Sequence, residues 1–158
     1  GRTEDNAMHY RIRKAGYKIC VTLDIISYQH VRSSWRGIIK QKFLNGYWIG
    51  LTLSICPYCF SIFHFIPFVF CLALIVSIIL YALGYKMLFL ILVLAYIVCN
   101  LVMSFLAILK GKPCLQYIVL PIIFLSLHIS YGIGTMCGLI KRPFWWYRNV
   151  KKEGIERC

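Results

Sequence analysis

The sequence MLFLILVLAYIVCNLVMSFLAIL, residues 87–109, contains no charged side chain. A helix that crosses the hydrocarbon core of a bilayer needs about 20 consecutive apolar residues, so this stretch is long enough for one span. The region around it has the same character, because residues 51–140 carry only three charged side chains, Lys86, Lys110 and Lys112. We therefore expect a mostly α-helical membrane protein.

Two short lysine-bearing breaks divide residues 51–140, which we expect to form the membrane domain. They separate three predicted spans at residues 66–83, 87–109 and 115–140. The first apolar run, 51–83, is too long for one span of about 20 residues and too short for two. Because Pro57 and Pro67 interrupt it, we interpret residues 51–65 as a re-entrant or interfacial approach to the first span.

The basic residues are concentrated at the two ends of the chain. The net charge is +13, and all but three of the 18 Lys and Arg lie outside residues 51–140. Lys and Arg beside apolar spans meet anionic headgroups, which favours lipid over nucleic acid as the partner. Residues 141–158 form a basic tail, and Trp145 and Trp146 are its expected interfacial anchors. Three spans place this tail opposite the basic N-terminal part, whereas the positive-inside tendency places both in the cytoplasm, and this conflict stays open.

The eight cysteines do not indicate a disulfide scaffold. Most of them fall inside apolar runs, where Cys behaves as a small hydrophobe. Cys56 and Cys59 have C-x-x-C spacing, but a zinc or redox site normally needs a second pair or a thioredoxin-like context. We interpret the pair as incidental and predict no metal site.

Residues 1–50 are expected to contain two helices joined by extended chain. Thr3 is a candidate N-cap for a helix that starts with Glu4 and Asp5 and stops at Gly16. Residues 17–22 and 25–30 have the alternating or β-branched character of short strands. Residues 34–50 predict an amphipathic helix with the apolar face Trp35, Ile38, Ile39 and Phe43. We favour a place in the membrane interface for it over packing on a soluble domain.

Few side chains are candidates for chemistry. Glu4 and Asp5 either complement the helix dipole, which is the commoner role, or supply a general base. His64 and His128 are either proton relays, lipid-phosphate contacts or, as we favour, partners in hydrogen bonds between helices. Gly132 and Gly134, with nearby serines, suit close packing of helices.

A longer pattern carries more information than these single residues. Glu4-Asp5 is followed by Tyr10-Arg11-Ile12-Arg13-Lys14-Ala15-Gly16, and similar segments follow at 28–34, 40–48, 64–67 and 127–134. In this order they resemble the end of the catalytic domain and the membrane part of family 2 glycosyltransferases, especially the exopolysaccharide group that includes succinoglycan biosynthesis proteins. The resemblance covers most of the chain.

The resemblance implies that residues 1–33 are the C-terminal piece of a GT-A-type α/β catalytic domain, a helix plus short strands. It further implies an inverting sugar transfer in which Asp5 is the base and Glu4 supports it. Gln41 matches the glutamine that begins the family's Q-x-x-R-W-type signature, but Leu44 stands in place of the arginine and Trp48 comes late. Ala7 also replaces an acid that is often found after the catalytic Asp.

The family's nucleotide-binding half lies upstream and carries a D-x-D motif that holds a divalent metal, Mg or Mn. No D-x-D is present here, and the chain begins at Gly1. We therefore expect a fragment of a longer parent that binds neither metal nor nucleotide sugar by itself. The parent's partners would be a nucleotide-sugar donor and a lipid-linked or glycan acceptor at the cytoplasmic face of the cell membrane. His30 and Arg32 would contact either acceptor phosphate or lipid headgroups.

A non-enzymatic protein is the alternative. A small membrane scaffold or subunit would use the same basic ends to bind anionic lipid. A transporter is disfavoured, because the apolar spans are few and contain no acidic residue. The stretch upstream of Gly1 separates the first two interpretations, since only the enzyme requires a D-x-D-bearing domain there.

Overall fold

The computed structural model describes residues 3–20, 22, 24–28, 32–110 and 118–151. This part of the chain is helical and contains no strand. Its elements are α1 (Glu4–Lys14), α2 (Trp35–Thr52), the 3₁₀ turns η1 (Pro57–Cys59) and η2 (Ile62–Phe65), α3 (Ile66–Ala82), α4 (Lys86–Lys110), α5 (Leu120–Trp145) and the π-helical turn η4 (Trp146–Lys151).

Three of these helices are long and apolar enough to cross a membrane, as predicted. α3 and α4 match the predicted spans to within one residue at each end, and Gly84, at φ +100°, makes the turn between them. α5 begins later than residue 115, at Leu120, and Pro121 occupies its first turn. It also continues beyond Ile140 to Trp145, so the predicted basic tail begins as helix.

The N-terminal helix forms with one correction. α1 carries Glu4 and Asp5 in its first turn and stops before Gly16, whose φ of +87° an L side chain rarely adopts. Thr3 precedes the helix but makes no capping hydrogen bond. Its hydroxyl bonds instead to the hydroxyl of Thr52, at the end of α2. Thr3 therefore joins α1 to α2 and does not cap its own helix.

The short strands expected at 17–22 and 25–30 do not form in the residues described there. Ile25 and Tyr28 are exposed, and the described part of this chain supplies no strand with which they can pair. A strand depends on a neighbour for its backbone hydrogen bonds, so β-branched composition alone does not create one. His30 lies outside the described residues.

The predicted amphipathic helix is α2, and Ser34 caps it by accepting a hydrogen bond from the Gly37 amide at 3.2 Å. The chain then becomes irregular through η1 and η2, as the prolines indicate. Trp35 is exposed, whereas the later part of the helix, from Gly46 to Thr52, is largely buried. Its location in a membrane interface stays a prediction.

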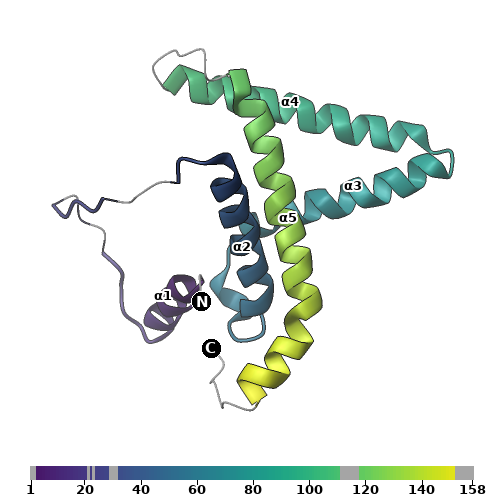
Figure 1. Cartoon of the computed structure of the whole chain (residues 1–158). Helices are drawn as coiled ribbons and strands as arrows, with labels where there is room; N and C mark the ends of the chain where they lie inside the picture. The colour runs from purple at the N-terminus through teal and green to yellow at the C-terminus, as the bar shows by residue number, and fades with distance from the viewer. Residues whose placement is uncertain (1–2, 21, 23, 29–31, 111–117, 152–158) are drawn as a thin grey trace.

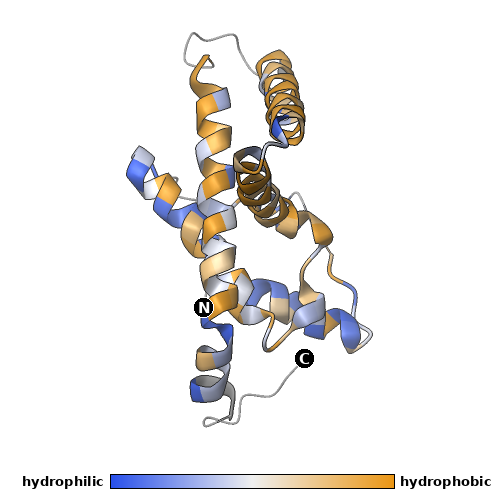
Figure 2. Ribbon diagram, turned by 90° about the vertical axis from the view of Figure 1, so that its right-hand side faces the viewer, coloured by the Kyte–Doolittle hydropathy of each residue, from blue (hydrophilic) through white to orange (hydrophobic). Residues whose placement is uncertain are grey.

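α5 is the central element of the fold (Figure 1). α2 lies along one side of it, while α3 and α4 form a hairpin that projects from the other side. α1 lies near the end of the α2–α5 pair that contains Thr52. Figure 2 shows that α3 and α4 are hydrophobic around nearly their whole circumference, whereas α1 is mostly polar.

Glycines let α2 and α5 approach to backbone contact, and we call this contact the glycine seam. It consists of Gly46 and Gly50 on α2 and Gly134 and Gly138 on α5, each pair with G-x-x-x-G spacing. A Cβ added to Gly134 would overlap the carbonyl oxygen of Phe43, and one added to Gly50 would lie 2.7 Å from the Gly138 backbone. Any larger side chain would therefore force the helices apart.

The two helices of the seam run in the same direction. Ser130 Oγ donates a hydrogen bond to the carbonyl of Ile39 at 2.9 Å, Gly134 meets Phe43, and Gly138 meets Tyr47. Residue numbers thus rise together along both helices, by one turn at each contact. The carboxyl ends of α2 and α5 consequently lie together.

The hairpin is attached to α5 at two points. Gly132 packs against Pro67 and Cys71 at the start of α3, where an added Cβ would overlap the Cys71 sulfur. Asn100 Nδ2 of α4 donates a hydrogen bond to the Pro121 carbonyl at 3.0 Å. Glycines of α5 therefore allow close packing of both α2 and α3, which explains why α5 is the central helix of the fold.

Candidate functional site

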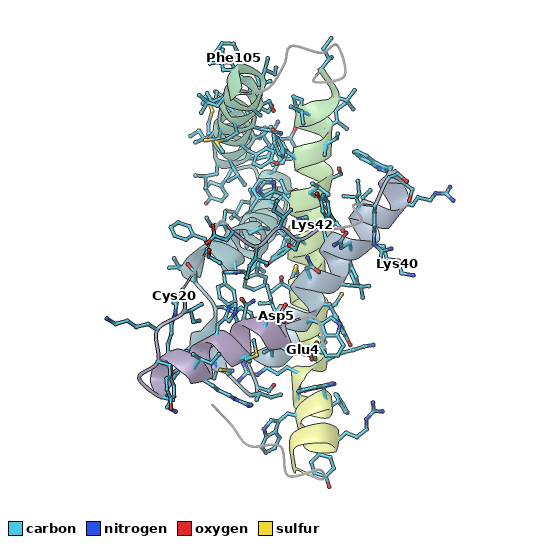
Figure 3. The ribbon with its side chains drawn as sticks, turned by 90° about the vertical axis from the view of Figure 1, so that its left-hand side faces the viewer. Glu4, Asp5, Cys20, Lys40, Lys42 and Phe105 are labelled. Atoms are coloured by element: carbon cyan, nitrogen blue, oxygen red, sulfur yellow. The ribbon has the colours of Figure 1, made fainter. Side chains whose placement is uncertain are left out.

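The acidic pair predicted as the catalytic centre lies at the start of α1. Thr3 and Thr52 are buried and joined by their hydroxyls, and α1 also contacts η1. Glu4 and Asp5 follow Thr3 directly and are exposed (Figure 3). The fold thus ties the start of α1, with its two exposed acidic residues, to the carboxyl end of α2.

Aromatic and basic side chains gather at the same end of the α2–α5 pair. The Trp48 ring meets the Trp145 ring edge-on, with centroids 6.4 Å apart. Ser54, just after α2, lines a cavity of about 380 Å³ together with Arg142, Pro143 and Trp146 of the α5 end. The Lys141 ammonium lies 5.9 Å from the centre of the Tyr47 ring. Indole rings beside cations are typical of the headgroup level of a membrane.

The structure brings only some of the predicted site residues together. Trp48 lies one helical turn before Thr52, and so near the acidic pair. Gln41 is exposed and lies 11 residues before Thr52, which at 1.5 Å per residue is about 16 Å along the helix. Arg32 is exposed ahead of α2, and His30 is outside the described residues.

A second polar cluster was not predicted as a cluster. His64 of η2 and His128 of α5 line one cavity, together with Lys42 of α2 and Tyr131 of α5. The two histidines stand out in the sequence as polar groups in apolar runs, but 63 intervening positions hide their proximity. Nothing in the sequence marks Lys42 as a site residue, because a lysine on an amphipathic helix is ordinarily exposed to solvent.

The described residues contain no group of three or more His, Cys, Asp or Glu side chains suited to hold a metal ion. Glu4 and Asp5 are neighbouring acids at the start of α1, and the D-x-D carboxylates that would hold Mg or Mn are an expectation for a longer parent only. These residues therefore do not fit a resident metal, and no catalytic step proposed for this chain depends on one. Cys59 donates its thiol hydrogen to the Cys56 carbonyl at 3.0 Å, a local contact.

Comparison of the chain with protein-family models, with curated proteins and with solved structures gives no match.

Proposed function

We propose that this chain is the C-terminal, membrane-anchored part of an inverting family 2 glycosyltransferase, active in exopolysaccharide or cell-surface glycan synthesis. The observation that carries the proposal is the attachment of the acid-bearing helix α1 to the membrane domain through Thr3 and Thr52. This attachment holds the start of α1 at the end of α2, one helical turn from Trp48, whose ring meets Trp145. A lipid-linked acceptor would present its hydroxyl near that end.

The proposed chemistry needs one base from this chain. The Asp5 carboxylate accepts the proton of the acceptor hydroxyl while that oxygen bonds to the anomeric carbon of the donor sugar. The bond from that carbon to the diphosphate oxygen breaks, and its electron pair leaves with the nucleoside diphosphate. Attack from the opposite face inverts the configuration. Glu4 stands beside Asp5 in the first turn of α1, where we propose that it supports the base.

The distribution of basic residues supports a cytoplasmic location for this end. Arg11, Arg13 and Lys14 belong to α1, which attaches at Thr52. Lys141 and Arg142 belong to the end of α5, which meets the same end of α2. These two basic groups therefore lie at one end of the α2–α5 pair, as the positive-inside tendency favours for them. Arg36 and Lys40 lie toward the other end, in the first turns of α2.

The test is sugar transfer by the longer parent, with a panel of radiolabelled nucleotide sugars and membrane lipid extract as acceptor. We expect Asp5→Asn to lower transfer at least about 100-fold, the scale of general-base catalysis. The matched control is Asp24→Asn, the same change at an exposed acid whose side chain bonds only to nearby Thr22. Equal activity in both variants would remove Asp5 from the base role. A gene without an upstream catalytic domain would favour the membrane scaffold.

A further inference from the structure

The cavity between α2, η2 and α5 combines cationic and apolar walls. It has a volume of about 380 Å³, within the roughly 300–1,000 Å³ range of small-molecule sites. Four of its eight lining residues are polar or titratable, namely Lys42, His64, His128 and Tyr131. The other four are apolar. None of the described residues that line it is acidic, so the cavity attracts negative charge.

Lys42 is positioned differently from its neighbour Lys40. Lys40 is exposed, whereas Lys42 is half-buried and lines the cavity. Figure 3 shows the two lysines on opposite sides of α2. A half-buried ammonium is less screened by water, so it binds an anion more strongly than the solvated Lys40 does.

Both histidines have their tautomer set by the backbone. His64 Nδ1 lies 3.1 Å from the Ser61 carbonyl and His128 Nδ1 lies 2.8 Å from the Phe124 carbonyl. A carbonyl oxygen only accepts hydrogen bonds, so each Nδ1 carries the hydrogen and donates. This leaves Nε2 of each ring for a ligand: the neutral ring accepts a hydrogen bond there, for example from a phosphate hydroxyl, and the protonated ring donates one to an anionic oxygen.

A second, apolar cleft adjoins the cavity. It measures about 310 Å³, lies between α3, α4 and α5, and shares Phe124 and His128 with the first cavity. Tyr96 lines this cleft, and its ring meets the His128 ring edge-on with centroids 6.0 Å apart. The Tyr96 hydroxyl is buried and has no hydrogen-bond partner among the described residues.

We propose that Lys42, His64 and His128 bind the phosphate group of a membrane lipid, whose hydrocarbon chain occupies the adjoining cleft beside Tyr96. A cationic head site that adjoins an apolar cleft between candidate membrane-spanning helices matches an amphiphile with an anionic head. A soluble phosphate would leave the apolar cleft empty. The proposal stands on the cavity alone and holds whether or not the chain belongs to a glycosyltransferase.

The test is photocrosslinking of the full chain in phosphatidylcholine nanodiscs that contain a trace of photoactivatable phosphatidic acid. We expect the label on peptides containing residues 62–67 or 124–131. Lys42→Met should lower labelling about tenfold, because a charge-assisted hydrogen bond to phosphate is lost. Lys40→Met, the matched loss of charge on the opposite side of α2, should leave labelling unchanged. Lys42→Arg, which keeps the charge, should retain most of it and show that the fold tolerates change at this position.

Competition with unlabelled ligands distinguishes a lipid phosphate from free inorganic phosphate as the ligand of the cavity. Unlabelled phosphatidic acid should compete, whereas millimolar inorganic phosphate should not. Competition by inorganic phosphate would overturn a lipid site in favour of a free-anion site. Equal losses in Lys40→Met and Lys42→Met would overturn it in favour of general attraction between a basic surface and anionic lipid.

Discussion

The glycine seam and the α3–α4 hairpin differ in what they bury. The seam buries glycine, serine and threonine, with Ser130, Gly134, Thr135 and Gly138 of α5 all inaccessible. The hairpin exposes large apolar side chains on most of its surface, such as Ile79, Ile91 and Leu94. Small residues therefore fill most of the contact between α2 and α5, beside buried Ile49 and Leu51, while most large apolar side chains of the hairpin lie outside, unlike in a soluble core.

This contrast follows from the solvent. In lipid, burying a leucine gains little because the acyl chains are equally apolar, so helices associate through close backbone packing and hydrogen bonds. Glycine gives the closest approach, which explains its place in the seam. The exposed leucines of the hairpin need no protein partner if lipid covers them. Three of the changes below test the two halves of this comparison, and one tests the attachment of α1 as a weaker, local contact.

The largest effect is expected from a charge on the hairpin. Val98 is exposed near the middle of α4, and Val98→Asp should raise the apparent free energy of membrane insertion of α4 by about 3 kcal/mol. A translocon insertion assay with glycosylation sites flanking residues 86–110 measures it, with Val98→Leu as the control. Unimpaired insertion of the Asp variant would mean that residue 98 faces a polar environment rather than lipid.

A slightly smaller effect, a loss of stability, is expected when a large side chain replaces a glycine of the seam. Gly134→Leu should destabilise the protein by about 2–3 kcal/mol, because the added atoms overlap the Phe43 backbone. Ala95→Leu adds a larger side chain on the exposed face of α4 and should change stability by less than about 0.5 kcal/mol. Unfolding in mixed micelles, followed by tryptophan fluorescence, compares the two. Equal losses would contradict the difference between seam and hairpin.

The attachment of α1 is weaker and local. Thr3→Val and Thr52→Val should each loosen α1, and a double-mutant cycle should give a coupling of about 1 kcal/mol. Hydrogen exchange of the α1 amides measures the local stability, while the α5 amides serve as the internal reference. Strictly additive single effects would show that this hydrogen bond does not hold the helix.

The smallest change separates the two sources of stability in the seam. Ser130→Ala keeps a small side chain and removes only the hydrogen bond to Ile39, so it should cost about 0.6 kcal/mol. Ser126→Ala is its control, because the Ser126 hydroxyl bonds only within its own helix. Micelle unfolding of both variants gives the difference. A loss as large as that of Gly134→Leu would mean that the hydrogen bond stabilises the seam as much as the close approach of the helices does.

The candidate site was only partly predictable. Glu4 and Asp5 begin a helix as expected, because capping and dipole preferences are local. The capping role predicted for Thr3 was wrong. Its hydroxyl bonds to that of Thr52, which lies 49 residues away in the sequence. The cavity formed by Lys42, His64 and His128 was missed for the same reason, because each residue comes from a different element.

The apolar runs, their glycine and proline breaks and the concentration of charge at the ends determine the helices and their membrane character. These features depend on residues that are consecutive or close in the sequence, so they can be recognised without the tertiary structure. The same-direction pairing of α2 with α5, the placement of α1 beside the end of that pair that contains Thr52, and the cationic cavity arise only in the tertiary structure. They depend on contacts between residues distant in the chain, for which hydropathy carries no information.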